Sequence, residues 1–280
     1  MSSILSTVNN TRQAGGIRVV IAGQEKMGKT TLTTGAPGSL LVPCEVGFAG
    51  VSTPKTAMLQ TFTQLQQLIA EIATEAQARR FPFKSLVIDS VTAVERMVHD
   101  HTLSLDPAYR ADPKKTVTME SAHGGYGRAY TLANTIFQQF LGQLDMLAVY
   151  GGINIIFTAH VFASRVSDPT AGEYDSWDLL LHSPKNQKTY GKRELLTQWA
   201  DIIGFIYEPV FLTTADKSTM TRAVSQNKGR ILAVSRTPSY TAGNRFGIVG
   251  ELPLPAPPAN AWNNLAGALH QSSGIDLFSR

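Results

Sequence analysis

The chain has 280 residues, 43% of them hydrophobic, and a formal net charge of +4, which suits one large α/β domain with an anionic partner. A single cysteine, Cys44, excludes an intramolecular disulfide and favours a reducing compartment. Residues 1–13 do not read as a secretory leader and the longest apolar runs are too short to cross a bilayer, so we expect a cytoplasmic protein with no membrane partner.

Strands and helices are predicted to alternate along most of the chain. Residues 1–16 are polar, end in two glycines, and are interpreted as a flexible arm. Short apolar runs bounded by turn residues predict buried strands at 17–22, 39–43, 85–89, 153–158, 200–207 and 210–213. Apolar residues at helical spacing predict helices at 55–80 and 130–150, and shorter ones are expected at 29–34, 91–103 and 259–270.

Two long turn-rich segments, 106–127 and 161–193, interrupt this alternation, and segments of that length are usually functional or disordered. Residues 220–226 and 230–236, separated by Asn227-Lys228-Gly229, predict a C-terminal β-hairpin. The pattern predicts an α/β fold with a mostly parallel central sheet and helices on both faces. We therefore divide the chain into an arm (1–16), a core (17–250) and a proline-rich tail (251–280).

Residues 23–30 match the phosphate-loop pattern G-x-x-x-x-G-K-[ST] between a predicted strand and a predicted helix. In such a loop the main-chain amides face an anion, the lysine neutralises the β- and γ-phosphates, and the hydroxyl binds Mg²⁺. A chance match in an ordinary glycine turn would lack this context. The sequence therefore predicts binding of ATP and Mg²⁺ through Gly23, Gln24, Glu25, Lys26, Met27, Gly28, Lys29, Thr30 and Thr31.

Acidic residues follow two of the predicted strands. Asp89 ends the run 85–89 and is predicted to hold Mg²⁺ together with Thr30, although an aspartate there could instead cap the next helix. Ser90 stands where many ATPases carry a water-activating glutamate. We assign that role to Glu45, which follows strand 39–43; a solvated loop acid is the alternative.

His160 follows the predicted strand 153–158 and completes the catalytic set of Lys29, Glu45 and His160. A polar side chain there could face the γ-phosphate and report its presence to the following segment. The alternative is a histidine satisfied by neighbouring backbone.

Two stretches are basic. Residues 182–193 carry four cations and no acid, with an interleaved tyrosine, a composition that suits a nucleic-acid backbone with a stacked base. Residues 217–245 carry six cations and no acid, and fit either DNA or the nucleotide of a neighbouring subunit. A solvated face is the alternative for both. The predicted DNA contacts are Arg165, Lys185, Lys188, Tyr190, Lys192 and Arg193.

Several segments together resemble the RecA-like P-loop ATPases, and more closely the phage single-strand annealing recombination proteins. The resemblance spans about residues 17–250 and rests on IAGQEKMGKTTL (21–32), CEVGF (44–48), SLVIDSVTAVE (85–95), GGYGRAY (124–130), IIFTAHV (155–161) and TAGNRFGI (241–248). The sequence departs from the family pattern at Pro43, Val46 and His160, where relatives carry an acid, a glycine and a glutamine-like sensor.

This resemblance implies an ATP-dependent recombination or annealing protein that binds single-stranded DNA and hydrolyses ATP to ADP and phosphate. It also implies assembly as a filament or ring with ATP between subunits, and a basic residue that acts in trans on the neighbouring subunit's ATP (Lys228, Arg230 or Arg245). The DNA contacts that it implies lie at 161–193 and 106–127. It further implies a single-strand-binding protein as a partner and a phage protein that acts in the host cytoplasm. The alternatives are a helicase, a DNA-packaging motor, a regulatory ATPase that binds a protein, and a nucleotide-binding protein that does not hydrolyse.

Overall fold

The computed structural model describes residues 15–112, 114–184, 190–214, 221–225, 229–256 and 259–277. Its centre is one β-sheet. The strands of this sheet are β1 (Arg18–Gly23), β2 (Ser39–Pro43), β3 (Ser85–Asp89), β4 (Asn154–Ala159), β7 (Ile202–Tyr207), β10 (Arg230–Ala233), β11 (Gly243–Asn244) and β12 (Glu251–Leu254). Their order is β12-β10-β7-β1-β4-β3-β2, with β11 also paired to β7. The strands from β7 to β2 run parallel, and β10, β11 and β12 pair antiparallel, which confirms the predicted mostly parallel sheet.

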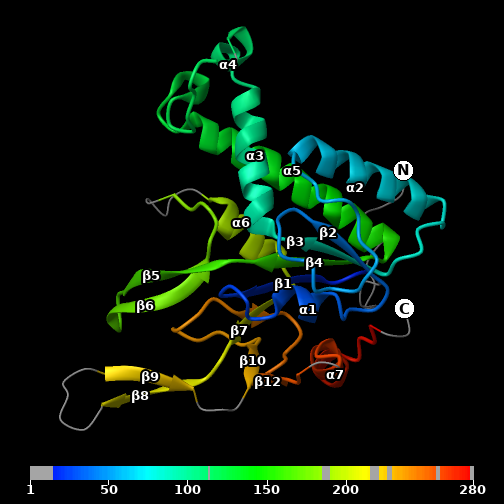
Figure 1. Ribbon diagram of the computed structural model, residues 1–280, viewed down its shortest axis with the longest axis vertical. Coiled ribbons are helices and arrows are strands. Elements are labelled where there is room, and N and C mark those ends of the chain that lie inside the picture. The colour runs from blue at the N-terminus through cyan, green and yellow to red at the C-terminus, as the bar shows by residue number, and fades with distance from the viewer. Residues whose placement is uncertain are drawn as a thin grey trace, which may run out of the picture.

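Helices cover both faces of the sheet, as predicted (Figure 1). They are α1 (Lys29–Thr33), α2 (Phe62–Gln77), α3 (Val91–Ser104), α4 (Pro107–Ala111), α5 (Arg128–Gly151), α6 (Lys192–Trp199), α7 (Trp262–Ser273) and a 3₁₀ turn, η2 (Ala122–Gly124). Alternate residues of each strand point to opposite faces. Val20 and Ala22 of β1 therefore pack with α2, α3, α5 and α6, whereas Val19 and Ile21 pack with α1 and α7.

Helix α2 begins later than the sequence predicts. Residues 54–59 run along β2 instead: the Leu41 amide donates to the Pro54 carbonyl, and the Thr56 and Leu59 amides donate back to β2 carbonyls, all within 2.9–3.0 Å. The Thr61 hydroxyl then caps the helix by accepting from the Gln64 amide at 3.2 Å. The predicted start of this helix at residue 55 is wrong because the segment's backbone groups are already used at the sheet edge.

Residues 161–193, predicted as a turn-rich loop, fold largely into a β-hairpin and the start of α6. Strands β5 (Val161–Asp168) and β6 (Gly172–Leu179) pair antiparallel over their whole length and project from the end of β4 (Figure 1). Residues 106–127 project separately as a small lobe that contains α4 and η2, where Asp106 caps α4 and also accepts from the His123 amide at 2.6 Å.

The prediction that residues 220–226 and 230–236 pair with each other in a hairpin is wrong. Strand β8 (Val210–Thr214) pairs with β9 (Thr221–Ser225), and β10 joins the central sheet between β7 and β12. The apolar side chains of Leu232 and Ala233 explain this choice, because they are buried in the sheet beside β7.

The sheet extends past residue 250, into the segment predicted as a tail. Strand β12 forms its edge, and the Asn264 side chain of α7 donates to the Pro253 carbonyl at 2.6 Å. Trp262, Leu265 and Leu269 of α7 are fully buried. The segment after residue 250 is therefore part of the packed fold, whereas the predicted arm lies almost wholly outside the described residues.

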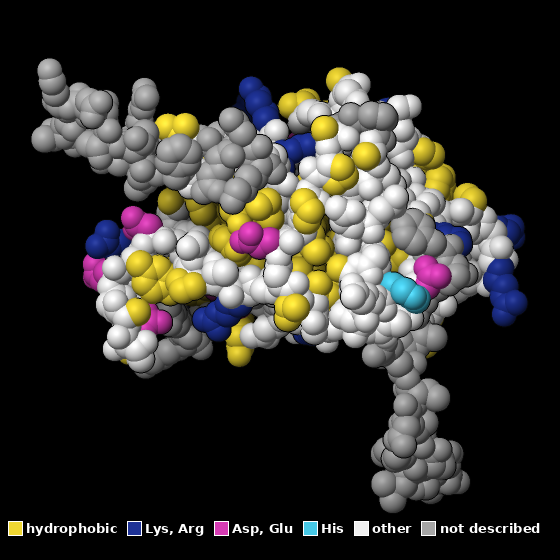
Figure 2. Space-filling view, turned by 90° about the horizontal axis from the view of Figure 1, so that it is seen from below, with side chains coloured by type: hydrophobic (Ala, Val, Ile, Leu, Met, Phe, Trp, Pro, Cys, Tyr) yellow, Lys and Arg dark blue, Asp and Glu magenta, His cyan; other side chains and the backbone are white. Residues whose placement is uncertain are grey.

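Figure 2 shows the lower face of the molecule. Apolar side chains gather near its middle, and the Lys and Arg side chains stand apart from one another rather than forming a stripe. Within the described part of the chain, none of the helices combines the length and apolar character needed to cross a bilayer.

We expect Trp262→Ala to lower the free energy of unfolding by about 3–5 kcal/mol, because it removes a large side chain that is 0% exposed. Urea unfolding of the purified variant measures this. Tyr126→Ala is the control, since Tyr126 is 98% exposed and its loss should cost less than about 0.5 kcal/mol. Equal midpoints for both variants would contradict a structural role for α7.

Candidate nucleotide site

The phosphate loop curves between the end of β1 and the start of α1. Lys29 is only 7% exposed, and its Nζ donates to the carbonyls of Gly23 and Gln24 at 2.8 Å each. Burial lowers the pKa of Lys29, and the nearby carboxylates of Asp89 and Glu45 oppose that shift. The ammonium is thus held inside the loop, while residues 24–26 are exposed at its tip.

Gly28 has a backbone conformation that favours glycine, and a side chain at this position would have to displace the end of Arg230. Its φ is +85°, and a Cβ at this position would lie 2.0 Å from Nη1 of Arg230. The same Nη1 donates to the Met27 carbonyl at 2.8 Å. Arg230 of β10 therefore supports the phosphate loop of its own chain.

Asp89 lies beneath the loop at the end of β3 and is 8% exposed. Its Oδ2 accepts from the Thr30 hydroxyl at 2.8 Å, and its Oδ1 accepts from the Thr158 hydroxyl of β4. Ser90, rather than Asp89, caps helix α3, because its Oγ accepts from the Ala93 amide at 3.2 Å. Thr158 was not predicted as part of the site, although its hydroxyl lies near the end of an apolar strand.

The donor set fits Mg²⁺. The Thr30 hydroxyl and the Asp89 carboxylate are hard oxygen ligands that lie together beside the loop, as this ion requires. These two residues would hold the ion, which when bound would neutralise charge on the β- and γ-phosphates. Thr158 would keep the carboxylate oriented.

Glu45 follows β2, and each of its two carboxylate oxygens lies close to a basic side chain. Its Oε1 lies 2.7 Å from His160 Nε2, and its Oε2 lies 3.3 Å from a guanidinium nitrogen of Arg96 on α3. Burial acts to raise the pKa of Glu45, but hydrogen bonds from His160 and Ser90 and the charges of His160 and Arg96 together outweigh it, so the pKa is lowered. The predicted catalytic acid and the predicted sensor are therefore in direct contact. Arg96 was not predicted, because nothing in the helix pattern of 91–103 distinguishes it.

The main chain of His160 connects this pair to the hairpin. Its amide donates to the Thr92 hydroxyl at 3.1 Å, and its carbonyl accepts from the Leu180 amide at 2.8 Å. Leu180 directly follows β6, so a shift of His160 would be transmitted to both strands of the hairpin.

A cavity of about 680 Å³ joins these groups into one site. Its lining includes Lys29, Thr30, Glu45, Asp89, Arg96 and His160. The cavity lies at the carboxyl ends of β1, β2, β3 and β4, where ligands of parallel sheets bind.

A strand, a glycine loop with a buried lysine, a helix and a strand-end aspartate beside a threonine hydroxyl define a P-loop nucleotide-binding protein. A family model described as an AAA domain matches residues 15–246, so the chain belongs to that family of P-loop ATPases. Membership indicates nucleotide-dependent ATPase activity and the use of Mg²⁺. No curated protein matches the chain.

The residues predicted to contact DNA differ in their exposure and in their contacts within the chain. Arg165 is exposed on β5, but it is paired with Glu173 at 3.1 Å and lies 3.8 Å from Asp175. Tyr190 is exposed, and its carbonyl accepts from the Asn134 side chain at 2.9 Å. Lys185 and Lys188 lie outside the described residues.

Lys192 is not a surface residue, and its prediction as a DNA contact is wrong for this structure. Its side chain is 0% exposed, and Nζ lies 3.8 Å from Glu95 Oε1 and 3.2 Å from Asn134 Oδ1. Burial lowers the pKa of Lys192 to about 8 and raises that of Glu95. The lysine instead neutralises a buried carboxylate between α3 and α6.

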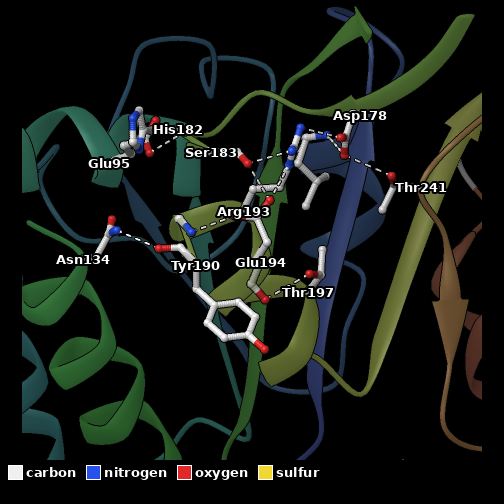
Figure 3. A network of polar contacts seen from close by, with 12 residues as sticks. Glu95, Asn134, Asp178, His182, Ser183, Tyr190, Arg193, Glu194, Thr197 and Thr241 are labelled. Carbon is white, nitrogen blue, oxygen red and sulfur yellow. Dashed lines mark hydrogen bonds and ion pairs between the residues drawn. The ribbon is translucent and has the colours of Figure 1, made fainter. Parts of the chain in front are cut away.

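Arg193 is likewise engaged within the chain (Figure 3). It pairs with Asp178 of β6 at 2.6 Å and with Glu194 at 3.1 Å, and it donates to the Ser183 hydroxyl at 2.7 Å. Asp178 also accepts from the Thr241 hydroxyl at 3.0 Å. Arg193 therefore fastens the base of the hairpin to α6, and its contact with DNA stays a prediction.

The residues predicted to act in trans are placed as follows. Arg230 supports its own loop, as described above. Arg245 pairs with Asp201 at 3.2 Å and donates to the Gln198 carbonyl. Lys228 lies outside the described residues. Both described arginines are therefore bonded within their own chain.

We expect Gly28→Ala to weaken ATP binding by roughly tenfold or more, because the new Cβ displaces Arg230 and forces a left-handed conformation costing about 1–3 kcal/mol. Titration calorimetry with ATP and Mg²⁺ measures the change. Gly142→Ala in α5, where a Cβ meets open space, should bind ATP like wild type.

Lys192→Met should destabilise the protein by about 3–5 kcal/mol at neutral pH, because it leaves Glu95 buried without its counter-ion. Chemical denaturation of this variant is compared with that of Lys114→Met, which changes an exposed lysine. Unchanged stability of Lys192→Met would show that the ion pair does not hold α3 and α6 together.

Proposed function

We propose that the chain hydrolyses ATP with Glu45 as the residue that orients the attacking water. The observation that carries this proposal is the Glu45 carboxylate fixed between His160 and Arg96 in the cavity that also contains Lys29, Thr30 and Asp89. Precise placement of a nucleophile beside a neutralised phosphate is the main requirement of phosphoryl transfer.

The lowered pKa of Glu45 defines what the carboxylate does. The group is ionised at neutral pH, so its oxygens accept a hydrogen bond from water. A carboxylate with a lowered pKa is a weak base, and its contribution is therefore orientation rather than full removal of a proton early in the reaction. Lys29 supplies the cation that balances charge on the transferred phosphoryl group.

His160 is proposed as the sensor of the γ-phosphate. Its ring shares a hydrogen bond with Glu45, while its carbonyl holds the residue that follows β6. A γ-phosphate that competes for this ring would move the hairpin base. The nucleotide state would then control a projecting element whose exposed side chains are free to meet a partner.

We propose single-stranded DNA as that partner, in an ATP-dependent recombination or annealing protein that assembles side by side with ATP between subunits. Support comes from the resemblance of six sequence segments to annealing proteins and from a β-hairpin that leaves the sensor strand directly. The fully exposed Tyr126 of the 106–127 lobe offers an aromatic face on which a base can stack. Lys185 and Lys188 are the candidate phosphate contacts.

A regulatory ATPase that binds a protein is the second candidate, and the charge of the hairpin favours it. Residues 161–179 carry one cation, Arg165, against the four acids Asp168, Glu173, Asp175 and Asp178. An acidic ribbon repels a phosphate backbone and attracts a basic surface.

Glu45→Gln should lower kcat for ATP hydrolysis by about 10²–10⁴-fold and leave ATP affinity within a few-fold, because the amide keeps the shape but loses the negative charge. Phosphate release under single-turnover conditions gives the rate. Glu71→Gln, at an exposed position of α2 outside the cavity, is the matched control. Equal rates for the two variants would remove Glu45 from the chemistry.

The partner is tested by fluorescence anisotropy with labelled single-stranded DNA, ATP and Mg²⁺. Wild type should bind, Lys29→Ala should not, and the double variant Lys185→Ala with Lys188→Ala should bind more weakly, with a salt slope smaller by about 0.7 for each lost phosphate contact. Negligible binding by wild type, together with ATP turnover indifferent to DNA, would leave the protein-binding alternative.

A further inference from the structure

One arginine of the nucleotide cavity makes only a weak contact. Arg96 of α3 lines the cavity together with Lys29 and Glu45, and its side chain is 66% exposed. Within the part of the chain that the structure describes, its hydrogen bond joins a guanidinium nitrogen to Glu45 Oε2 at 3.3 Å. That distance is long for a charge-assisted hydrogen bond, which is typically about 2.7–2.9 Å. The guanidinium therefore keeps most of its N–H donors available for another acceptor in the cavity.

The backbone that carries Arg96 is held firmly, although the side chain is exposed. Val94 and Val98 of the same helix are each 0% exposed. One turn before Arg96, the Thr92 hydroxyl accepts from the His160 amide at 3.1 Å, which joins α3 to the end of β4. Arg96 therefore extends from a fixed helix, and only its flexible side chain has to move to meet a ligand.

The contact with Glu45 places Arg96 close to the phosphoryl group that would be transferred. A water that donates to a carboxylate lies about 2.7–2.8 Å from it, and a nucleophile lies about 3–3.5 Å from the atom that it attacks. The γ-phosphorus would then lie within roughly 6–6.5 Å of the Glu45 carboxylate. A guanidinium that is 3.3 Å from that carboxylate can reach a γ-phosphate oxygen by rotation about its side-chain bonds.

The two described arginines that were predicted to act in trans are engaged elsewhere. Arg230 holds the phosphate loop of its own chain, and Arg245 pairs with Asp201. Arg96 instead lines the same cavity as Lys29 of its own chain. An arginine that stabilises charge during phosphoryl transfer can come from the same chain or from a partner, and the position of Arg96 favours the same chain.

We propose that Arg96 is a catalytic residue that contacts the γ-phosphate of the ATP bound to its own chain. This inference rests on the proposed ATPase function and adds a residue to it. The guanidinium turns from Glu45 Oε2 to the more highly charged phosphate, and that carboxylate oxygen is then free to accept from the attacking water. The planar guanidinium matches two phosphoryl oxygens at once, which a lysine cannot do.

The chemical step that Arg96 assists is the transfer of the phosphoryl group to water. The water oxygen bonds to the γ-phosphorus while the bond from phosphorus to the bridging oxygen breaks, and the electron pair of that bond leaves on ADP. One hydrogen of the water stays in the hydrogen phosphate product, and the other leaves as a proton to solvent. Arg96 neutralises the negative charge that spreads over the γ-oxygens as the bond breaks.

The test measures phosphate release by Arg96→Ala over a range of ATP concentrations in the presence of Mg²⁺. We expect kcat to fall about 10²–10³-fold, as on loss of one transition-state donor, while KM stays within a few-fold of wild type. Arg96→Lys keeps the charge without the planar fork, so it should retain more of the rate than Arg96→Ala. Arg80→Ala removes an exposed arginine outside the cavity and should turn over ATP like wild type.

A double variant separates direct contact with the phosphate from an effect through Glu45. Added to Glu45→Gln, Arg96→Ala should lower kcat further, by roughly tenfold or more, because the phosphate still loses its cation. No further loss would mean that Arg96 only positions Glu45, and this result overturns the proposal.

Mixing two variants separates action within one chain from action on a neighbour. Lys29→Ala keeps Arg96 but loses the lysine of the phosphate loop, so its mixture with Arg96→Ala should be no faster than Arg96→Ala alone. Recovery of turnover on mixing would show that Arg96 acts on the ATP of another copy, which also overturns the proposal.

Failure of this inference and failure of the proposed function give different results. Turnover by wild type that Arg96→Ala leaves unchanged overturns the role of Arg96, and the proposed ATPase function stands. Absence of turnover by folded wild type, with or without single-stranded DNA, removes the proposed function and this inference with it. Binding of a fluorescent ATP analogue to Arg96→Ala within a few-fold of wild type shows that the variant is folded.

Discussion

One buried carboxylate, that of Asp89, joins the elements that form the nucleotide site. It accepts from Thr30 on α1 and from Thr158 on β4, while its own strand pairs with β2 and β4. A carboxylate at this depth is tolerated only when hydrogen bonds satisfy it. The requirement fixes α1 against two strand ends, and the phosphate loop with Lys29 is positioned as a result. Glu45 and His160 enter the same cavity because parallel strands bring their carboxyl ends to one edge of the sheet.

Most of the sheet and the central chemistry could be predicted from the sequence for the same reason. Parallel strands buried on both faces are short continuous apolar runs, so β2 and β3 lie within the bounds that the sequence predicts. The side chains that follow such strands are close in space whatever the connections between them. This rule placed Asp89, Glu45 and His160 together without knowledge of the helices, and the contact between Glu45 and His160 is a direct consequence of it.

The remaining features depend on contacts that local pattern does not encode. The hairpin β5–β6 is only partly buried, so its residues carry no continuous apolar signal. Lys192 belongs to a basic stretch, yet its burial is decided by Glu95, which lies far away in the sequence. Strand β9 pairs with β8 rather than with β10, because Leu232 and Ala233 of β10 are buried in the central sheet. Charge counts and turn residues describe local composition. The hairpin, the burial of Lys192 and the partner of β9 depend instead on contacts between residues far apart in the sequence.

The two outer strands of the central sheet have a consequence for self-association. The free side of β2 is covered by the extended segment at 54–59, whose backbone already uses the exposed groups of Leu41 and Pro43. At the other margin, β12 carries Pro253, which has no amide hydrogen and whose carbonyl accepts from Asn264. Neither margin offers a continuous row of hydrogen-bonding groups to a strand from another molecule. Pairing between copies through an outer strand of this central sheet is therefore disfavoured at both margins.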